Sequence, residues 1–152
     1  MTALEPHRMD ETEIHEFMKD HGYGVLSLAD ESVAHGVPVS FGYHEDEGLF
    51  LCLHRFDEES TKHEFIERTS KASLTVIDTE SRESWGSVVV TGTLSEFETL
   101  TPSELTEKYV AGKRMQDNAW FPSFDVSEDD DVDSTMFAFS IDDITGLKGT
   151  GG

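Results

Sequence analysis

Two cations stand where a phosphate could bind. Arg55 and Lys62 are seven residues apart in a chain that has only 11 Lys and Arg against 32 Asp and Glu. Arg55 follows an apolar run that is predicted to be a strand, and Lys62 opens a predicted helix. Ser60 and Thr61 are good N-cap residues, and Thr61 with Glu64 has capping-box spacing. A helix N-terminus that carries a hydroxyl and a Lys favours phosphate binding.

The strand predicted over 33–43 has two unlike faces, because side chains alternate along a strand. One face is bulky and apolar: Val37, Val39, Phe41 and Tyr43. The other face is nearly bare: Gly36, Pro38, Ser40 and Gly42. A bare face leaves a flat slot in which a planar ligand can lie on the backbone. A flat slot followed by a phosphate site indicates flavin mononucleotide (FMN). The alternative is an edge strand with a proline, followed by a surface helix.

Composition narrows the function classes. The 152 residues predict one domain, 1–152, with a core over about 10–147. The net charge of −21 should repel nucleic acid and anionic membranes, so neither is an expected partner. High acidity with few Lys indicates a salt-adapted (halophilic) cytoplasmic protein, because salt screens self-repulsion.

Cysteine and histidine usage indicates a reducing compartment and no metal site. The one cysteine, Cys52, cannot form an internal disulfide, which fits a reducing compartment, and its apolar strand predicts a buried thiol. The seven His are scattered without ligand spacing, so no metal site is expected. The sequence has no signal peptide and no apolar run long enough for a membrane span.

The predicted elements favour a mainly β fold. Residues 1–9 are expected to be a loose lead-in, and a helix is expected from Asp10, with Glu13 in a capping box, to a C-cap at Gly22. The predicted strands are 23–29, 33–43, 49–54, 72–78, 84–98 and 135–147, and the further helices 60–69 and 101–112. Residues 113–134 are expected to be irregular. Short turns between strands favour antiparallel pairing, so we expect a six-stranded antiparallel barrel with peripheral helices.

Several finer expectations accompany these elements. Gly48 is expected to adopt a positive φ in the turn 44–48, and Gly86 and Gly92 to mark bulges or bends. Buried positions are expected at both Val25 and Leu26. In the helix 101–112, the inward residues are expected to be Leu105, Tyr109 and Val110.

The ordered segments YGVLSLA, HGVPVSFGY, GLFLCLH, ASLTVID and SWGSVVVTGTL, with the Lys-started helix between the third and the fourth, resemble the FMN-binding split-barrel proteins. That family includes pyridoxamine 5′-phosphate oxidase and the smaller nitroimidazole-resistance flavoproteins, and the smaller group is the closer likeness. The resemblance covers about residues 10–100. It implies a six-stranded split β-barrel and a homodimer with two FMN sites at its interface.

The resemblance also implies which residues hold the cofactor. The flavin ring would lie along Val37, Pro38, Val39, Ser40 and Phe41. Leu53 and His54 would lie near the ring or ribose, Lys62 would bind the phosphate, and Arg55 is a possible second cation. The fifth strand would approach the cofactor through Trp85, Ser87 and Val88. His54 is the candidate catalytic residue, as a proton relay, against a structural role as the alternative.

The sequence departs from the family near the phosphate. Asp57, Glu58 and Glu59 would oppose a dianion, and the basic pair that precedes this helix in the pyridoxamine-phosphate oxidases is not evident. These departures argue against the pyridoxamine-phosphate oxidase activity itself, and we expect an FMN-dependent oxidoreductase acting on a small molecule. The alternatives are a non-catalytic flavin-binding or redox-sensing protein, a haem-binding barrel with His54 or His35 as ligand, a barrel that binds a deazaflavin or FAD, and a structural domain.

Overall fold

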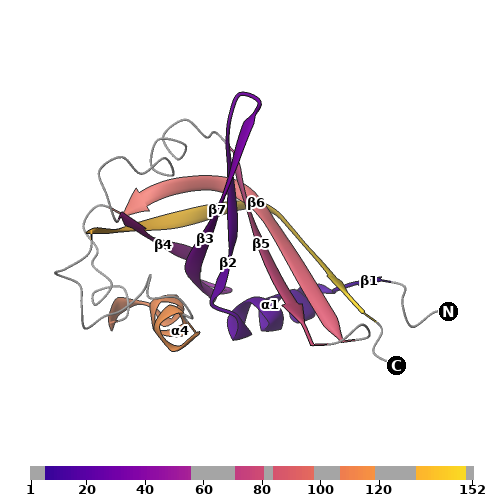
Figure 1. Cartoon of the computed structure of the whole chain (residues 1–152). Helices are drawn as coiled ribbons and strands as arrows, with labels where there is room; N and C mark the ends of the chain where they lie inside the picture. Colours follow the sequence, from indigo (N-terminus) through magenta and orange to yellow (C-terminus); the bar gives the residue numbers. More distant parts are fainter. Residues whose placement is uncertain (1–5, 56–70, 81–83, 98–106, 119–132, 150–152) are drawn as a thin grey trace.

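A computed structural model describes residues 6–55, 71–80, 84–97, 107–118 and 133–149 of the chain (Figure 1). The strands are β1 His7–Arg8, β2 Tyr23–Asp30, β3 Val33–His44, β4 Gly48–Arg55, β5 Ala72–Thr79, β6 Trp85–Phe97 and β7 Asp133–Lys148. The helices within these ranges are α1 Glu11–Asp20 and α4 Val110–Asn118. The helix predicted over 60–69 lies outside the described residues.

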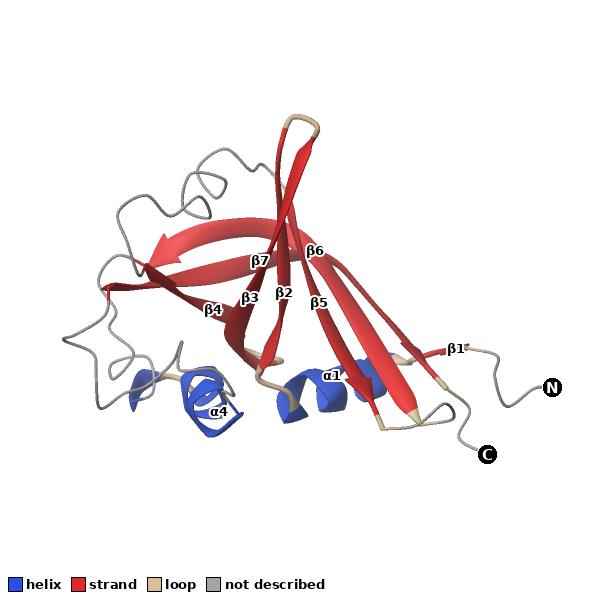
Figure 2. Cartoon of the chain, viewed as in Figure 1, coloured by secondary structure: helices blue, strands red, loops and turns tan. Residues whose placement is uncertain are grey.

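The strands close into a barrel. Their order in the sheet is β1-β7-β4-β3-β2-β5-β6, and β6 pairs with β7 as well, so β2 to β7 form a ring of antiparallel pairs. This confirms the predicted mainly β, six-stranded antiparallel barrel. Figure 2 shows α1 and α4 outside the strands. The predicted loose lead-in is wrong at its end, because His7 and Arg8 pair with Lys148 and Leu147 of β7.

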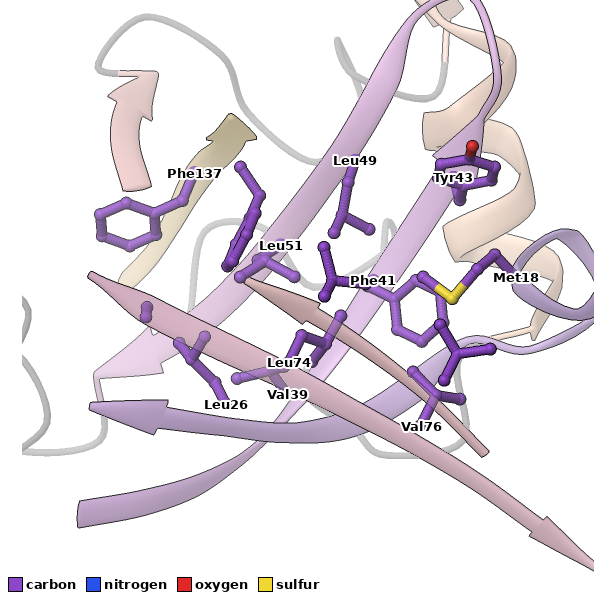
Figure 3. Close-up of a cluster of buried hydrophobic side chains, with 14 of the residues drawn as sticks. Met18, Leu26, Val39, Phe41, Tyr43, Leu49, Leu51, Leu74, Val76 and Phe137 are labelled. Atoms are coloured by element: carbon purple, nitrogen blue, oxygen red, sulfur yellow. The ribbon is translucent and has the colours of Figure 1, made fainter. Parts of the chain in front are cut away.

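The interior of the barrel is an apolar core that follows the two-residue period of the strands. The apolar face of β3 is directed inward, with Val39 and Phe41 fully buried. Figure 3 shows Phe41 among side chains from β2, β4, β5 and α1. The prediction that Val25 and Leu26 are both buried is wrong for Val25, which is 45% exposed, because neighbours on a strand face opposite ways.

Helix α1 begins as predicted. The Asp10 carboxylate accepts a bond from the backbone N–H of Glu13, and the Glu13 carboxylate accepts one from the backbone N–H of Asp10, which completes a capping box. Ile14 and Met18 are buried against the barrel. The helix ends at a C-cap at His21, one residue before the predicted Gly22.

The glycine predictions are confirmed in part. Gly48 has a φ of 104° in the β3–β4 turn, a conformation that glycine adopts without strain. The β6–β7 register shifts between Thr91 and Gly92, as expected for a bulge. Gly86 is not a bulge, since it stays in register with Asp78 and Lys148.

Helix α4 differs from the prediction. It covers Val110–Asn118, so the predicted end near Gly112 is wrong and residues 113–118 are helical rather than irregular. Ala111 and Met115 are buried, whereas Val110, predicted to face inward, is 46% exposed. The helix begins at Val110 because a distant side chain caps it there. The Glu47 carboxylate accepts hydrogen bonds from the backbone N–H groups of Val110 and Ala111, at 3.1 and 2.8 Å. Residues 98–106 lie outside the described ranges.

Candidate functional site

Strands β3 and β4 part after Cys52. They pair from Ser40 with Cys52 to His44 with Gly48. Beyond Cys52, residues 53–55 of β4 have no partner on β3, while the other edge of β4 stays paired with β7 from Leu49 to Arg55. Residues 33–39 of β3 therefore have β2 on one side and, within the described residues, no strand on the other. We call this opening the β3–β4 split.

The backbone of β3 presents polar groups to the β3–β4 split. The Phe41 N–H donates to the Gly22 carbonyl at 2.9 Å, so odd-numbered residues of this strand direct their backbone groups toward β2. Gly36 and Pro38 consequently direct theirs toward the split. Proline lacks an N–H, which suits a position without a ladder donor. The Gly36 N–H and the carbonyls of Gly36 and Pro38 form an edge that can bond a ligand with amide-like groups.

The bare outward face of β3 is open over half its predicted length. Gly36 and Pro38 are exposed, but Ser40 and Gly42 are buried. Helix α4 packs on the Gly42 end, where a Cβ atom would lie 1.9 Å from the Ala111 carbonyl oxygen. The predicted four-residue slot is therefore shortened to the stretch around Gly36 and Pro38, beside the β3–β4 split.

Four of the predicted contact residues direct their side chains into the core: Val37, Val39, Phe41 and Val88. Any contact between these residues and a ligand at the β3–β4 split would therefore come from their backbone. Ser40 is the buried polar side chain of this region.

Trp85 and Ser87 belong to a different part of the outer face. A row of paired residues runs across the sheet from Pro38 through Val25 and Thr75 to Val89. This row spans three strand spacings, so Pro38 and Val89 are roughly 14 Å apart. Trp85 lies a further four residues from Val89 along β6, which adds roughly 13 Å in the direction of the strand. The two ends of the predicted site, Pro38 and Trp85, are therefore not brought together within one chain.

The predicted phosphate-binding residues lie mostly beyond what the structure describes. Backbone pairs place Leu53, His54 and Arg55 opposite Thr135, Ser134 and Asp133, at the mouth of the β3–β4 split. Their side chains lie outside the described set. Lys62 and the acidic residues 57–59 also lie outside the described residues, so the phosphate site stays a prediction.

The far end of β3 is held by contacts that sequence reasoning missed. The Tyr43 hydroxyl lies 2.6 Å from His15 Nδ1, and Arg114 Nη1 donates to the Tyr43 carbonyl at 2.9 Å. Burial, reinforced by the nearby charges of Glu45 and Glu11, raises the pKa of Tyr43. No local spacing links these residues, because they come from three separate elements.

Two further site types find no support among the described residues. No three His, Cys, Asp or Glu side chains there gather closely enough to hold a metal ion. No described helix is long and apolar enough to cross a membrane.

Comparison with known proteins identifies the relatives. The sequence profile described as pyridoxamine 5′-phosphate oxidase matches residues 10–148. No curated protein sequence matches the chain.

Several solved structures share the fold. An FAD-binding protein from Mesorhizobium loti has a TM-score of 0.68 at 17% identity, covering 95% of this chain and 96% of its own. A protein provisionally assigned to 5-nitroimidazole antibiotic resistance, from Bacteroides thetaiotaomicron, has a TM-score of 0.63 at 18% identity, covering 95% and 87%. The heme storage protein HutZ from Vibrio cholerae has a TM-score of 0.59 at 16% identity, covering 93% and 96%. At these identities the likeness establishes the split-barrel fold alone.

Proposed function

Because this chain belongs to the pyridoxamine 5′-phosphate oxidase family, with residues 10–148 matched, we propose that it binds FMN at the β3–β4 split. The observation that carries the proposal is the backbone edge of Gly36 and Pro38, which no strand in the described part of the chain covers, beside a bare, exposed strand face. A flavin ring is flat and has N–H and C=O groups along one edge. It therefore fits a surface that offers backbone donors and acceptors but no bulky side chain.

Each predicted contact residue has a place in this proposal. Val37, Val39 and Phe41 support the ring through their backbone, and Pro38 and Ser40 flank it. Leu53 and His54 reach the ring or ribose from the end of β4. Lys62, with Arg55 as the second cation, neutralises the phosphate.

We propose a homodimer in which Trp85 and Ser87 complete the site of the second copy, while Val88 supports their strand from the core. On the outer face of the barrel, five large apolar side chains are 39–59% exposed: Tyr23, Val25, Ile77, Val89 and Leu147. Val25 and Val89 lie in the row that begins at Pro38, so this apolar surface continues into the slot. A second copy that covers the surface would bring its Trp85 toward a flavin that one chain alone cannot span.

The activity proposed is that of an oxidoreductase acting on a small molecule. Bound flavin supplies hydride and electron transfer. The protein positions the ring on β3, excludes water from it through the second copy, and places His54 as a residue that can relay a proton. Cys52 is buried and forms no disulfide, which accords with the cytoplasmic location that we propose.

The test is the visible absorption spectrum of the purified protein, with chromatography of any ligand released on denaturation. Released FMN supports the proposal, and a colourless protein that takes up no added FMN contradicts it. The Lys62→Ala variant should bind FMN roughly ten- to a hundredfold more weakly, as loss of a charge-assisted phosphate bond predicts. Anaerobic reduction of bound flavin by nicotinamide nucleotides or a deazaflavin donor separates an oxidoreductase from a non-catalytic flavin carrier.

Haem is the second candidate ligand. The barrel shares its fold with a heme storage protein, and His35 lies partly buried on β3, one residue before Gly36 and on the opposite face of the strand. Haem and flavin have different absorption spectra, so the same measurement decides between them.

A further inference from the structure

Helix α1 lies near the ends of β5, β6 and β7 (Figure 1). A groove is lined by residues of all four elements. Its volume is about 400 Å³. It is lined by Phe17 of α1, Asp78 of β5, Trp85 of β6 and Lys148 of β7. Asp78 lies three residues beyond Thr75, which belongs to the row of Pro38, so the groove is separate from the β3–β4 split.

One wall of the groove is aromatic. The rings of Phe17 and His21 are stacked, with centroids 4.2 Å apart and planes at 21°. His21 is fixed between two acceptors, because its Nδ1 lies 2.6 Å from the Phe17 carbonyl and its Nε2 lies 3.0 Å from Asp78 Oδ2. Trp85 lines the same groove. The wall therefore offers flat apolar surface that its own hydrogen bonds hold in place.

The rim of the groove carries an excess of negative charge. Its carboxylates are Glu13, Glu16, Asp20, Asp78 and Glu80. Three of them have partners: Glu13 pairs with Lys148, Glu16 with Lys19 and Asp78 with His21.

The other two carboxylates, Asp20 and Glu80, pair with no cation in the part of the chain that the structure describes. Glu80 accepts a 3.3 Å hydrogen bond from the Ser84 hydroxyl. The groove therefore combines aromatic surface with two uncompensated carboxylates.

We propose that this groove binds a small organic cation with a flat apolar body, such as an aromatic amidinium or ammonium. The apolar body would pack against Phe17 and Trp85, where a cation also gains from the ring faces. Its charge would compensate Asp20 and Glu80. Anions are repelled by the rim, and the described residues offer no cluster of three ligands for a metal ion. The proposal goes beyond the flavin site, with which the groove shares Trp85 alone.

The test is calorimetric titration of the full-length protein with benzamidinium, and with benzamide as its neutral isostere. We expect saturable binding of one benzamidinium per chain and at least about tenfold weaker binding of benzamide, since charge recognition supplies the difference. Backbone amide signals of Phe17 and His21 should shift in NMR spectra with the same saturation curve. Equal binding of the two probes, or binding of Mg²⁺ without benzamidinium, overturns the proposal.

The variant Asp20→Asn/Glu80→Gln locates the site. It removes both uncompensated charges at exposed positions, so the barrel should remain folded, and it should weaken benzamidinium binding about two- to tenfold. The matched control is Asp46→Asn/Glu107→Gln, which changes the net charge equally at exposed positions away from the groove. If both variants weakened benzamidinium binding equally, the net charge of the protein would explain the effect, and a local site would be refuted. Trp85 is left unchanged, because the proposed flavin site also uses it.

Discussion

Gly42 lies against Ala111 so closely that a Cβ atom at Gly42 would come within 1.9 Å of the Ala111 carbonyl oxygen. Strand β3 and helix α4 therefore touch through backbone atoms. The variant Gly42→Ala should destabilise the protein by about 1–3 kcal/mol, as overpacking does elsewhere, by pushing α4 off the strand. Urea denaturation measures the loss.

Gly36→Ala is the control for that variant. Gly36 is on the same strand and face, but among the described residues a Cβ there would meet only Val25 Cγ1, at 3.4 Å, which is an ordinary contact. We expect a change below about 1 kcal/mol. Equal destabilisation by both variants would show that glycine as such, and not the α4 contact, matters.

Filling the slot should remove the cofactor. Gly36→Val places a branched side chain on the surface where we propose that the flavin ring lies, while the position itself is exposed. FMN affinity should fall at least about tenfold, because the added side chain would clash with the bound ring. Stability should change little, because the side chain points to solvent when no ligand is bound. Fluorescence titration with FMN measures it. Ala34→Val, two residues away on the same face, should bind FMN normally, and unchanged affinity in Gly36→Val would place the ring elsewhere.

The apolar outer face should control assembly. Ile77→Lys introduces a charge into the surface that a second copy would cover, and burial of two such charges per dimer is unfavourable. Light scattering should show a fall from twice 17.0 kDa toward 17.0 kDa. Val33→Lys is a matched control, because Val33 is also 59% exposed but lies at the tip of the β2–β3 hairpin. A wild-type monomer, or a dimer unaffected by Ile77→Lys, contradicts this interface.

Tyr43 should make stability fall at alkaline pH. Because burial raises its pKa in the folded chain, the unfolded chain releases this proton first, at a pH of about 10. The stabilisation is present below that pH and is lost as the pH rises through the folded value. Tyr43→Phe should flatten this decline while costing about 1 kcal/mol at neutral pH, for the bond to His15. Urea denaturation from pH 8 to 11 would contradict this if both proteins declined in parallel.

Salt should stabilise the protein. With a net charge of −21, self-repulsion acts over about 10 Å at 0.1 M salt but only about 3 Å at 1 M. The melting temperature should therefore rise between those concentrations. Sucrose is the control, since it acts through exclusion from the surface without screening charge. A melting temperature that does not respond to salt removes the salt-adapted interpretation.

Features governed by neighbours in the sequence could be predicted. The alternation of β3, the capping box at Asp10, the positive φ at Gly48 and the bulge at Gly92 each depend on local geometry. The closed barrel followed from the number of strands and the short turns between them. The bare half-face at Gly36 and Pro38 was likewise visible in the alternation of residue types.

Features that depend on distant partners could not be predicted. Helix α4 begins where Glu47, 63 residues earlier in the sequence than Val110, accepts its first N–H groups. The covering of Gly42 by Ala111 shortens the slot, and nothing near Gly42 in the sequence indicates it. The groove beside α1 joins His21 to Asp78 across 57 residues, which no spacing rule anticipates.

The position of β7 has a consequence for how the chain folds. This last strand, Asp133–Lys148, pairs with β4 over residues 133–139 and with β6 over residues 136–148, so both pairings that attach it to the ring must form before the barrel closes. During synthesis, β4 and β6 are made long before their partner, and their edges stay unsatisfied until residue 148 has left the ribosome. Pairings so distant in sequence slow folding and leave intermediates prone to aggregation. Truncation within β7 should therefore yield insoluble chains rather than a smaller folded barrel.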